Sequence, residues 1–300
     1  MAAGGGGLSR ADRRRAEDLE LAGWIGGEFG LGTIDQVVRQ WRDRGCLLTV
    51  WSDLALAALL GGIGAFLFAF PPHGDRRIKD FVGVFTGGTA VLAVLLIALG
   101  ERFKVMRSWY FLYSGGVAQV ARTRPQPRVL VLRWTEVETV TVILETDDDG
   151  NPETNVDRCV LSGPGTEITA GPSAGLLAED PGPILAAAAH RNLAPRLVPP
   201  LIHAWESGEP VTAGELSIGQ DAITVPTGTR HAWSQITSMA VTYASGPDPA
   251  PITRIDFRPA GTDRADQISL SGIPNGIFLA HLIAHAATGH GVHVARYQRP

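Results

Sequence analysis

The sequence predicts an α+β protein in which a transmembrane α-helical hairpin is followed by two small antiparallel β-barrel or β-sheet domains, each closed by a C-terminal helix. Three observations lead to this fold class. Two long apolar runs lie in the first third of the chain, segments of alternating apolar and polar residues follow them, and one pattern around a tryptophan occurs twice. The chain therefore divides into an N-terminal part (1–46), the hairpin (47–100) and two β domains (105–208 and 211–295).

The two apolar runs cover residues 47–70 and 81–99. Each is long enough for a helix that crosses a bilayer, which needs about 20 apolar residues. Basic residues near the outer ends of the runs outnumber those in the loop between them, and basic residues favour the cytoplasmic side. The sequence therefore predicts a multi-pass protein of the cell membrane with two spans and with both termini in the cytoplasm. The basic residues are Arg39, Arg42, Arg44, Arg102, Lys104 and Arg107 outside, and Arg76, Arg77 and Lys79 in the loop.

The N-terminal part contains two segments that differ in composition. Residues 1–18 are densely charged and poor in apolar residues, which predicts an unstructured tail. Residues 33–45 carry apolar side chains at helical spacing after a suitable N-cap, Thr33, so we expect a short amphipathic helix there. Directly before a span, such a helix is expected to lie on the membrane surface. Its apolar residues are Ile34, Val37, Val38 and Trp41.

Beyond residue 107 the apolar residues alternate with polar ones, which is typical of half-buried strands. A helical segment at 181–193 follows these strands, and Pro195 is expected to end it before a second helical segment at 198–209. The first β domain therefore consists of strands followed by a helix. The expected strands are 109–113, 117–122, 129–134, 137–145, 159–162 and 167–170.

The second β domain repeats this plan at an offset of 99 residues, because WTEVETVTV at 134–142 corresponds to WSQITSMAV at 233–241. The two tryptophans are expected to be anchors in the core or at its rim. A last helix is expected after Asn275, a suitable N-cap, and Gly289 is expected to end it. The expected strands outside the repeated pattern are 214–218, 222–225, 253–257 and 267–270.

Three stretches carry a resemblance to a known family: residues 115–142, residues 201–224, and the segment Ile273-Pro274-Asn275 with Phe278. The strand pattern and the W-x-x-V-x-x-V spacing resemble bacterial pleckstrin-homology-like (PH-like) domains. More specifically, the chain resembles a family of bacterial membrane proteins without an established activity, in which a two-span hairpin precedes tandem PH-like domains. The resemblance implies the fold and no chemistry.

The histidines near the C-terminus are the metal-ligand candidates. His281 and His285 are spaced i, i+4, which suits zinc, and His290 and His293 follow them. The metallopeptidase motif needs Glu directly after the first histidine, and Leu282 stands there. A metal-dependent enzyme at these histidines remains an alternative, and no cofactor is expected. The sequence has no nucleophile elbow, phosphate-binding loop or dinucleotide fingerprint, so we predict that the protein is not an enzyme.

The arginines of the loop between the second and third expected strands are the best binding candidates. Arg122, Arg124 and Arg128 could attract anionic lipid headgroups. A second binding mode is protein contact, because small sheets often leave an edge strand open to an added peptide. The net charge of −4 gives no reason to expect nucleic acid.

Together these observations predict a non-enzymatic, membrane-anchored binding or scaffolding protein. It presents two PH-like modules at the cytoplasmic membrane surface. The expected partners are membrane lipids and a further membrane or cytoplasmic protein. The alternatives are an anionic-lipid-sensing regulatory protein and a metal-dependent enzyme.

Overall fold

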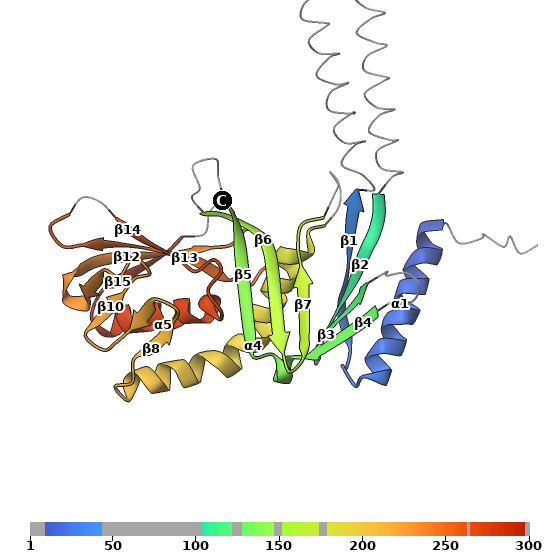
Figure 1. The fold of residues 1–300 in the computed structure, drawn as a ribbon, viewed down its shortest axis with the longest axis horizontal. Helices are drawn as coiled ribbons and strands as arrows, with labels where there is room; N and C mark the ends of the chain where they lie inside the picture. The colour runs from blue at the N-terminus through green and yellow to red at the C-terminus, as the bar shows by residue number, and fades with distance from the viewer. Residues whose placement is uncertain are drawn as a thin grey trace, which may run out of the picture. The chain divides into compact units, whose positions relative to one another are not determined.

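The computed structural model describes residues 10–43, 104–121, 128–146, 152–173, 179–262 and 265–297 (Figure 1). These residues form four β-sheets and three α-helices. One compact unit contains the described residues up to Gln40, from Ser108 to Pro172 and from Glu179 onward. The contacts discussed below lie within this unit.

The first domain has two sheets followed by helix α4 (Pro181–Glu206). A short 3₁₀ helix, η1 (Trp134–Glu136), leads from the first sheet to the second. The first sheet, in spatial order, contains β1 (Ile34–Asp43), β2 (Lys104–Tyr113), β3 (Gly116–Ala121) and β4 (Arg128–Arg133), and the second contains β5 (Thr139–Thr146), β6 (Pro152–Gly163) and β7 (Thr166–Ala170).

The core of the first domain lies between its sheets and α4. Alternate residues of β5 are buried, as expected for a strand with one face on a core. They meet apolar side chains of β6 and α4, such as Leu161 and Leu185. Trp134 is buried in this core, and its indole N–H donates to the carbonyl of Tyr113 at 2.9 Å. The expectation that this tryptophan is a core anchor is confirmed.

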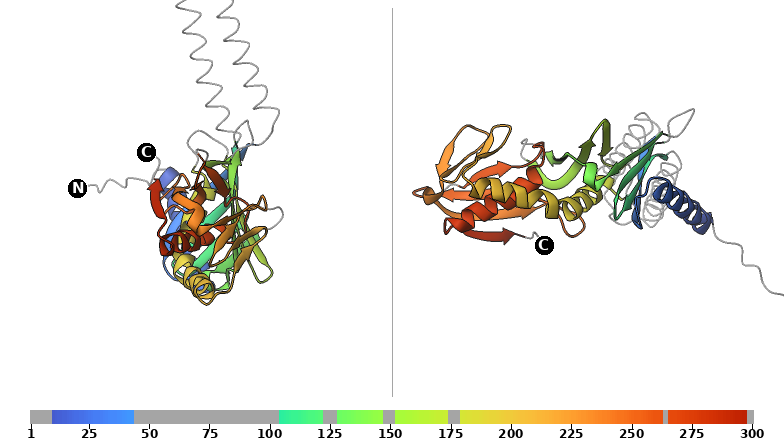
Figure 2. Two further views of the ribbon diagram at one scale, coloured as in Figure 1. Left: turned by 90° about the vertical axis from the view of Figure 1, so that its left-hand side faces the viewer. Right: turned by 90° about the horizontal axis from the view of Figure 1, so that it is seen from below.

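Helix α1 (Arg10–Glu28) packs on the opposite face of the first sheet (Figure 2). Ala22 and Ile25 of the helix form an apolar cluster with Phe111 and Val120 of the sheet. The hydroxyl of Tyr113 donates to the carbonyl of Ala22 at 2.8 Å, and burial raises the pKa of Tyr113 to about 12. Both faces of this sheet are therefore covered.

The second domain repeats this order of elements. η2 (Trp233–Gln235) again joins two sheets, and Trp233 is fully buried. Helix α5 (Gly276–Gly289) follows the strands, and β15 (His293–Tyr297) then returns to pair in parallel with β12. The remaining strands are β8 (Val211–Ala213), β9 (Leu216–Ile218), β10 (Ala222–Thr224), β11 (Arg230–Ala232), β12 (Ile236–Tyr243), β13 (Ile252–Pro259) and β14 (Asp266–Ser269).

Each long helix contributes to both cores. The first half of α4 lies in the core of the first domain, whereas Trp205 near its end belongs to the core of the second. In return, Ile277 and Phe278 of α5 are buried in the core of the first domain. The two helices lie side by side (Figure 2). The domains are thus packed into one another through their helices.

The predicted fold class requires a correction in its membrane part. In the described ranges no helix is both long and apolar enough to cross a membrane. The two apolar runs of the predicted hairpin, 47–70 and 81–99, lie outside the described residues. The described residues are mainly β, with four sheets and three α-helices, and they give no support to a transmembrane hairpin or to a two-span location in the cell membrane. We therefore withdraw these predictions.

The prediction of an amphipathic helix at 33–45 is wrong, because β1 occupies 34–43. Val38 and Gln40 are buried toward the core, whereas Val37 packs toward α1 and Arg39 pairs with Asp18 of α1. This alternation between two covered faces outweighs the helical spacing of the apolar residues. The first domain therefore starts before the expected boundary at 105, and its sheet combines segments from both sides of residues 44–103.

The expected helix break at Pro195 is also wrong, since α4 continues through Pro195, Pro199 and Pro200. All three prolines are exposed. Their rings and the backbone carbonyls left without a donor therefore lie toward solvent, where water can replace the lost hydrogen bonds. Packing of the opposite side of α4 on two cores outweighs the remaining cost. The expected strands of both domains and the last helix are confirmed in the described residues.

Candidate functional site

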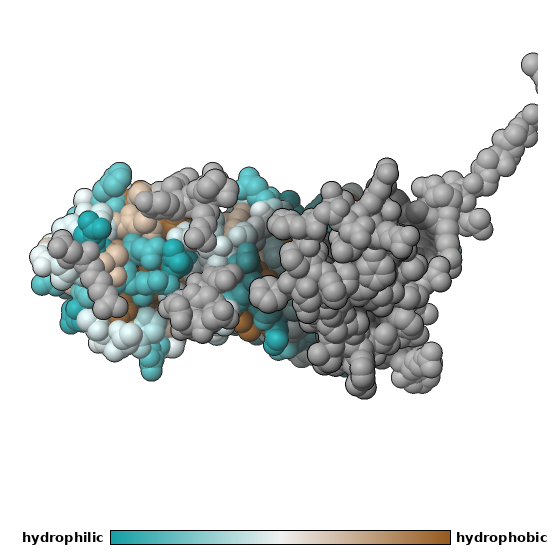
Figure 3. Space-filling view, turned by 90° about the horizontal axis from the view of Figure 1, so that it is seen from above, coloured by the Kyte–Doolittle hydropathy of each residue, from teal (hydrophilic) through white to brown (hydrophobic). Residues whose placement is uncertain are grey.

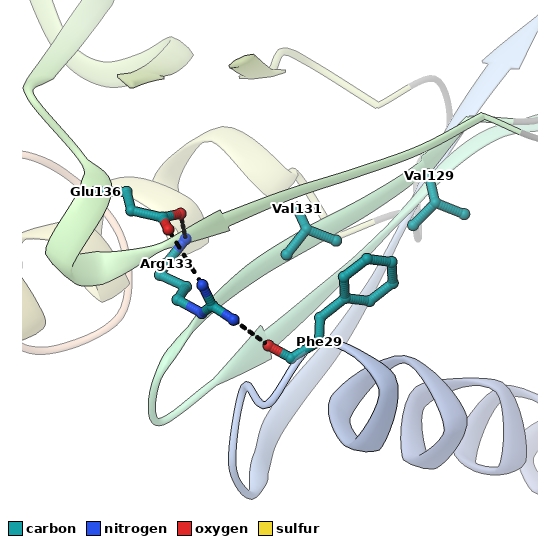
Figure 4. A pocket seen from close by; sticks show the side chains of 5 residues that line it. All are labelled: Phe29, Val129, Val131, Arg133 and Glu136. Atoms are coloured by element: carbon teal, nitrogen blue, oxygen red, sulfur yellow. Dashed lines mark hydrogen bonds and ion pairs between the residues drawn. The ribbon is translucent and has the colours of Figure 1, made fainter. Parts of the chain in front are cut away.

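An open groove lies between β4 and the C-terminal end of α1 (Figure 4). Its volume is about 310 Å³. β4 is the last strand of its sheet, so one side of its backbone pairs with β3 and the other side borders the groove. The residues that line it are Phe29, Val129, Val131, Arg133 and Glu136.

The backbone of β4 offers hydrogen-bonding groups on its outer side. The N–H of Trp134 donates to the carbonyl of Gly115 at 3.0 Å, in continuation of the β3–β4 pairing. Because N–H groups of an antiparallel strand alternate between its two sides, those of Val129, Val131 and Arg133 point away from β3. In the described part of the chain no further strand pairs with this side of β4.

The side chains at the groove are mainly apolar. Val129 and Val131 are half-buried and pack against the cluster under α1, as does Phe29. Leu132, between them and Arg133, points to the opposite side and is buried in the domain core. In Figure 4 the two valines and the ring of Phe29 line the space between strand and helix.

Arg133 and Glu136 close one end of the groove. The guanidinium donates to Glu136 Oε1 at 3.2 Å and to the carbonyl of Phe29 at 3.0 Å, which links β4 to the end of α1. Glu136 Oε2 also accepts the outward N–H of Arg133 at 3.2 Å. The two side chains are 51% and 43% exposed, so their ion pair contributes at most about 1 kcal/mol.

The other end of β4 carries one of the arginines singled out from the sequence. Arg128 begins the strand, is exposed and directly precedes Val129 of the groove. Arg122 and Arg124 lie outside the described residues. The structure therefore brings Arg128 to the groove and leaves the predicted lipid-binding set of three arginines untested.

The C-terminal histidines do not converge on one point. His281 contacts His190 of α4, with 2.8 Å between the Nε2 atoms and the rings stacked. Burial lowers the pKa of His190. One ring of the pair therefore donates an N–H to the other when both are neutral.

The remaining histidines have separate surroundings. His285 Nε2 lies 3.2 Å from Glu206 Oε1, and the ring of His290 stacks on Trp233. His293 begins β15. Within the described ranges no three His, Cys, Asp or Glu side chains are grouped so that they could hold a metal ion.

The edge of β5, the first strand of the second sheet, is covered by residues of the same chain. The segment before α5 lies along β5: the N–H of Gly272 donates to the carbonyl of Val142 and that of Asn275 to the carbonyl of Val140, both at 2.8 Å. The N–H of Val140 donates to Asn275 Oδ1 at 3.0 Å. Asn275 precedes α5 as expected for an N-cap, but its side chain bonds to β5 and makes no capping hydrogen bond.

Only part of this site was predictable from the sequence. The alternating pattern predicted a strand at Val129 and Val131, but nothing in the pattern indicates that this strand lies at an edge of its sheet. Phe29 was also missed. Residues 1–18 were predicted to be an unstructured tail and no helix was expected before residue 33, whereas α1 occupies Arg10–Glu28 and ends directly before Phe29. For Glu136 the sequence did contain a signal of a structural role, because its spacing from Trp134 is repeated by Gln235 and Trp233 in the second domain.

Comparisons with known proteins add no function to this geometry. The chain matches no model of a known protein family, and the search of curated proteins finds no significant match. The resemblance to a PH-like family therefore stays a prediction.

Proposed function

We propose that this protein is a non-enzymatic binding or scaffolding protein, and that its first domain binds an extended peptide segment of a partner protein along β4. The observation that carries the proposal is the open side of β4 next to an apolar groove. An added strand gains affinity from backbone hydrogen bonds, and pockets for its alternate side chains supply specificity.

The backbone groups of Val129 and Val131 would make those hydrogen bonds. Their N–H groups point away from β3, and no described strand pairs with them. The third outward N–H, that of Arg133, is already bonded to Glu136. The site therefore has room for a short segment that ends before Arg133.

The edge of β5 supports the proposal in one respect, because it accepts backbone hydrogen bonds from a segment outside its sheet. There the segment 271–275, which consists mainly of turn residues, donates two backbone N–H groups to carbonyls of β5 at 2.8 Å, and the side chain of Asn275 accepts the N–H of Val140. This contact joins the two domains and closes the β5 edge. The open edge of β4 offers the same type of backbone surface to another chain.

The second domain shows that the fold does not require an apolar groove at this place. At the offset of 99 residues, the positions of Val129 and Val131 are taken by Gly228 and Arg230. The face of the second domain seen in Figure 3 is mostly hydrophilic, with small hydrophobic patches. The apolar residues along β4 are therefore a property of the first domain alone.

The test is selection of peptides from a phage-displayed random library by the full-length chain. We expect enriched peptides with apolar residues at two alternate positions. Val131→Pro removes one outward N–H, and an edge strand tolerates proline where its N–H faces solvent. The selected peptides should bind this variant about 10-fold more weakly, the size of one lost hydrogen bond.

Val131→Thr is the matched control, because it keeps the N–H and the β-branched shape and should retain most of the affinity. Phe29→Ala serves as a second variant, which removes one wall of the groove without touching the β4 backbone. The proposal fails if no peptide is enriched, or if enriched peptides bind Val131→Pro and Phe29→Ala as tightly as the unchanged chain.

A further inference from the structure

We infer that the peptide bound along β4 carries an acidic side chain directly next to one of its two apolar residues, the one opposite Val129. This inference rests on the proposed function and names the chemistry of the partner. It follows from the charges at the two ends of β4 and from the alternation of side chains along an added strand.

The two ends of β4 differ in charge. At one end, Arg133 is neutralised by the carboxylate of Glu136 at 3.2 Å. At the other end, Arg128 is exposed and has no ion pair with any described residue. Among the described residues of the site, Arg128 is therefore the positive charge without a carboxylate partner, and it lies at the start of the strand.

The position of this charge relative to the groove is fixed by the strand. Val129 and Val131 point toward α1, whereas Arg128 belongs to the alternate set of residues with Leu130 and Leu132. A residue of an added strand faces the same side as its neighbour on β4, at a distance of about 5 Å between Cβ atoms. The residue opposite Arg128 therefore lies outside the groove, and the residues opposite Val129 and Val131 lie in it.

The resulting pattern is an acidic residue, an apolar residue, any residue and a second apolar residue. It is read in this order if the peptide runs parallel to β4 and in the reverse order if it runs antiparallel. A basic residue at the first position would place like charges directly opposite each other, which is unfavourable. The partner is thus a protein segment with a carboxylate beside an alternating apolar pair.

The experiment repeats the library selection with the Arg128→Glu variant of the full-length chain. Against the unchanged chain we expect Asp or Glu next to the apolar pair. Against Arg128→Glu we expect Lys or Arg at that position, and peptides from the first selection should bind the variant at least about threefold more weakly, as expected for an exposed ion pair. Arg230→Glu, on β11 of the second domain, is the matched control and should select the same peptides as the unchanged chain.

The outcomes separate this inference from the proposed function. If peptides are enriched and Val131→Pro weakens them, but both selections yield the same residue next to the apolar pair, the inference is wrong and the binding mode stands. Enriched peptides with a basic residue against the unchanged chain would also overturn it. If no peptide responds to Val131→Pro, the proposed function itself fails.

Discussion

Trp134 and Trp233 occupy the same position in the two domains and are held in the same way. Each indole is buried, and each donates its N–H to a backbone carbonyl at about 3 Å. Two residues later, Glu136 in one domain and Gln235 in the other accept the N–H of the residue before the tryptophan. These groups are common to both domains, so they are what the turn between the sheets requires.

The strand before each tryptophan shows the difference. On its face toward α1, β4 carries apolar residues and an arginine. The corresponding positions in the second domain are polar or small. The same order of elements thus carries different residues along the two strands, and in the described part of the first domain the apolar ones border a groove. The corresponding residues are Val129, Val131 and Arg133 in the first domain and Gly228, Arg230 and Ala232 in the second.

The largest effect is expected from removing the shared anchor. Trp134→Ala and Trp233→Ala should each lower the free energy of unfolding by about 3–5 kcal/mol, because each leaves a cavity in a core. Urea denaturation followed by circular dichroism measures this loss. A loss below about 1 kcal/mol for either variant would show that the two tryptophans are not equivalent.

The next largest effect is expected from a residue of the second domain that is buried in the core of the first. Phe278→Ala changes a residue of α5 but should destabilise the first domain by about 3 kcal/mol, since its ring is buried in that core. Faster hydrogen exchange in β5–β7 would report this loss. Phe257→Ala, in the core of the second domain, is the control and should act first on β12–β14. Unchanged exchange in β5–β7 with Phe278→Ala would contradict the shared core.

A gain of stability is expected in the helix that links the domains. Pro195→Ala restores an N–H in the interior of α4 at an exposed position. The gain should be about 1–2 kcal/mol, because the helix cost of proline exceeds its benefit through the unfolded chain. Thermal unfolding measures it. A loss of stability would mean that the helix needs the proline for its direction.

The contact between the two helices should make stability depend on pH. Burial lowers the pKa of His190, so the unfolded chain binds a proton more readily than the folded one. This contribution to stability is fully present above the ordinary histidine value of about 6.5 and is lost as the pH falls below it. The melting temperature should therefore fall on acidification.

His190→Gln should reduce this dependence, measured as the change in melting temperature between about pH 7.5 and about pH 5.5. The exposed His203 of the same helix provides the control, and His203→Gln should leave the dependence unchanged. If His190→Gln shows the full dependence, another group causes it.

The smallest effect is expected from exchanging the two capping groups. Glu136→Gln gives the first domain the residue that the second one uses, so the hydrogen bond to the backbone remains and only the exposed ion pair with Arg133 is lost. The stability should change by less than about 0.5 kcal/mol. A larger loss in thermal unfolding would show that the charge of Glu136 contributes to the fold.

The repeated pattern predicted the secondary structure well because it reflects burial within each domain. Val140 and Met239, for example, are buried as alternating residues on strands. The helix prediction at 33–45 was wrong because the apolar residues of this segment fit helical spacing as well as they fit a strand that is covered on both faces. Only pairing with β2, far along the sequence, decides between the two.

The groove was not predictable for a similar reason. An edge strand and a buried strand can have the same sequence pattern, and Phe29 reaches β4 only through the packing of α1. The occupied edge of β5 was equally hidden, because the segment that covers it comes from the other domain. Local sequence patterns do not record which strand ends a sheet.

The placement of β1 also affects the order in which the first sheet is made during synthesis. About 60 residues separate the end of β1 from the start of β2. At about 5–20 residues per second, β1 is complete roughly 3–12 s before the synthesis of β2 begins. Helix α1 is made just before β1 and contacts it through Val37 and through the pair of Arg39 with Asp18. We expect α1 to shield β1 from other chains during these seconds, until its partner strand is complete.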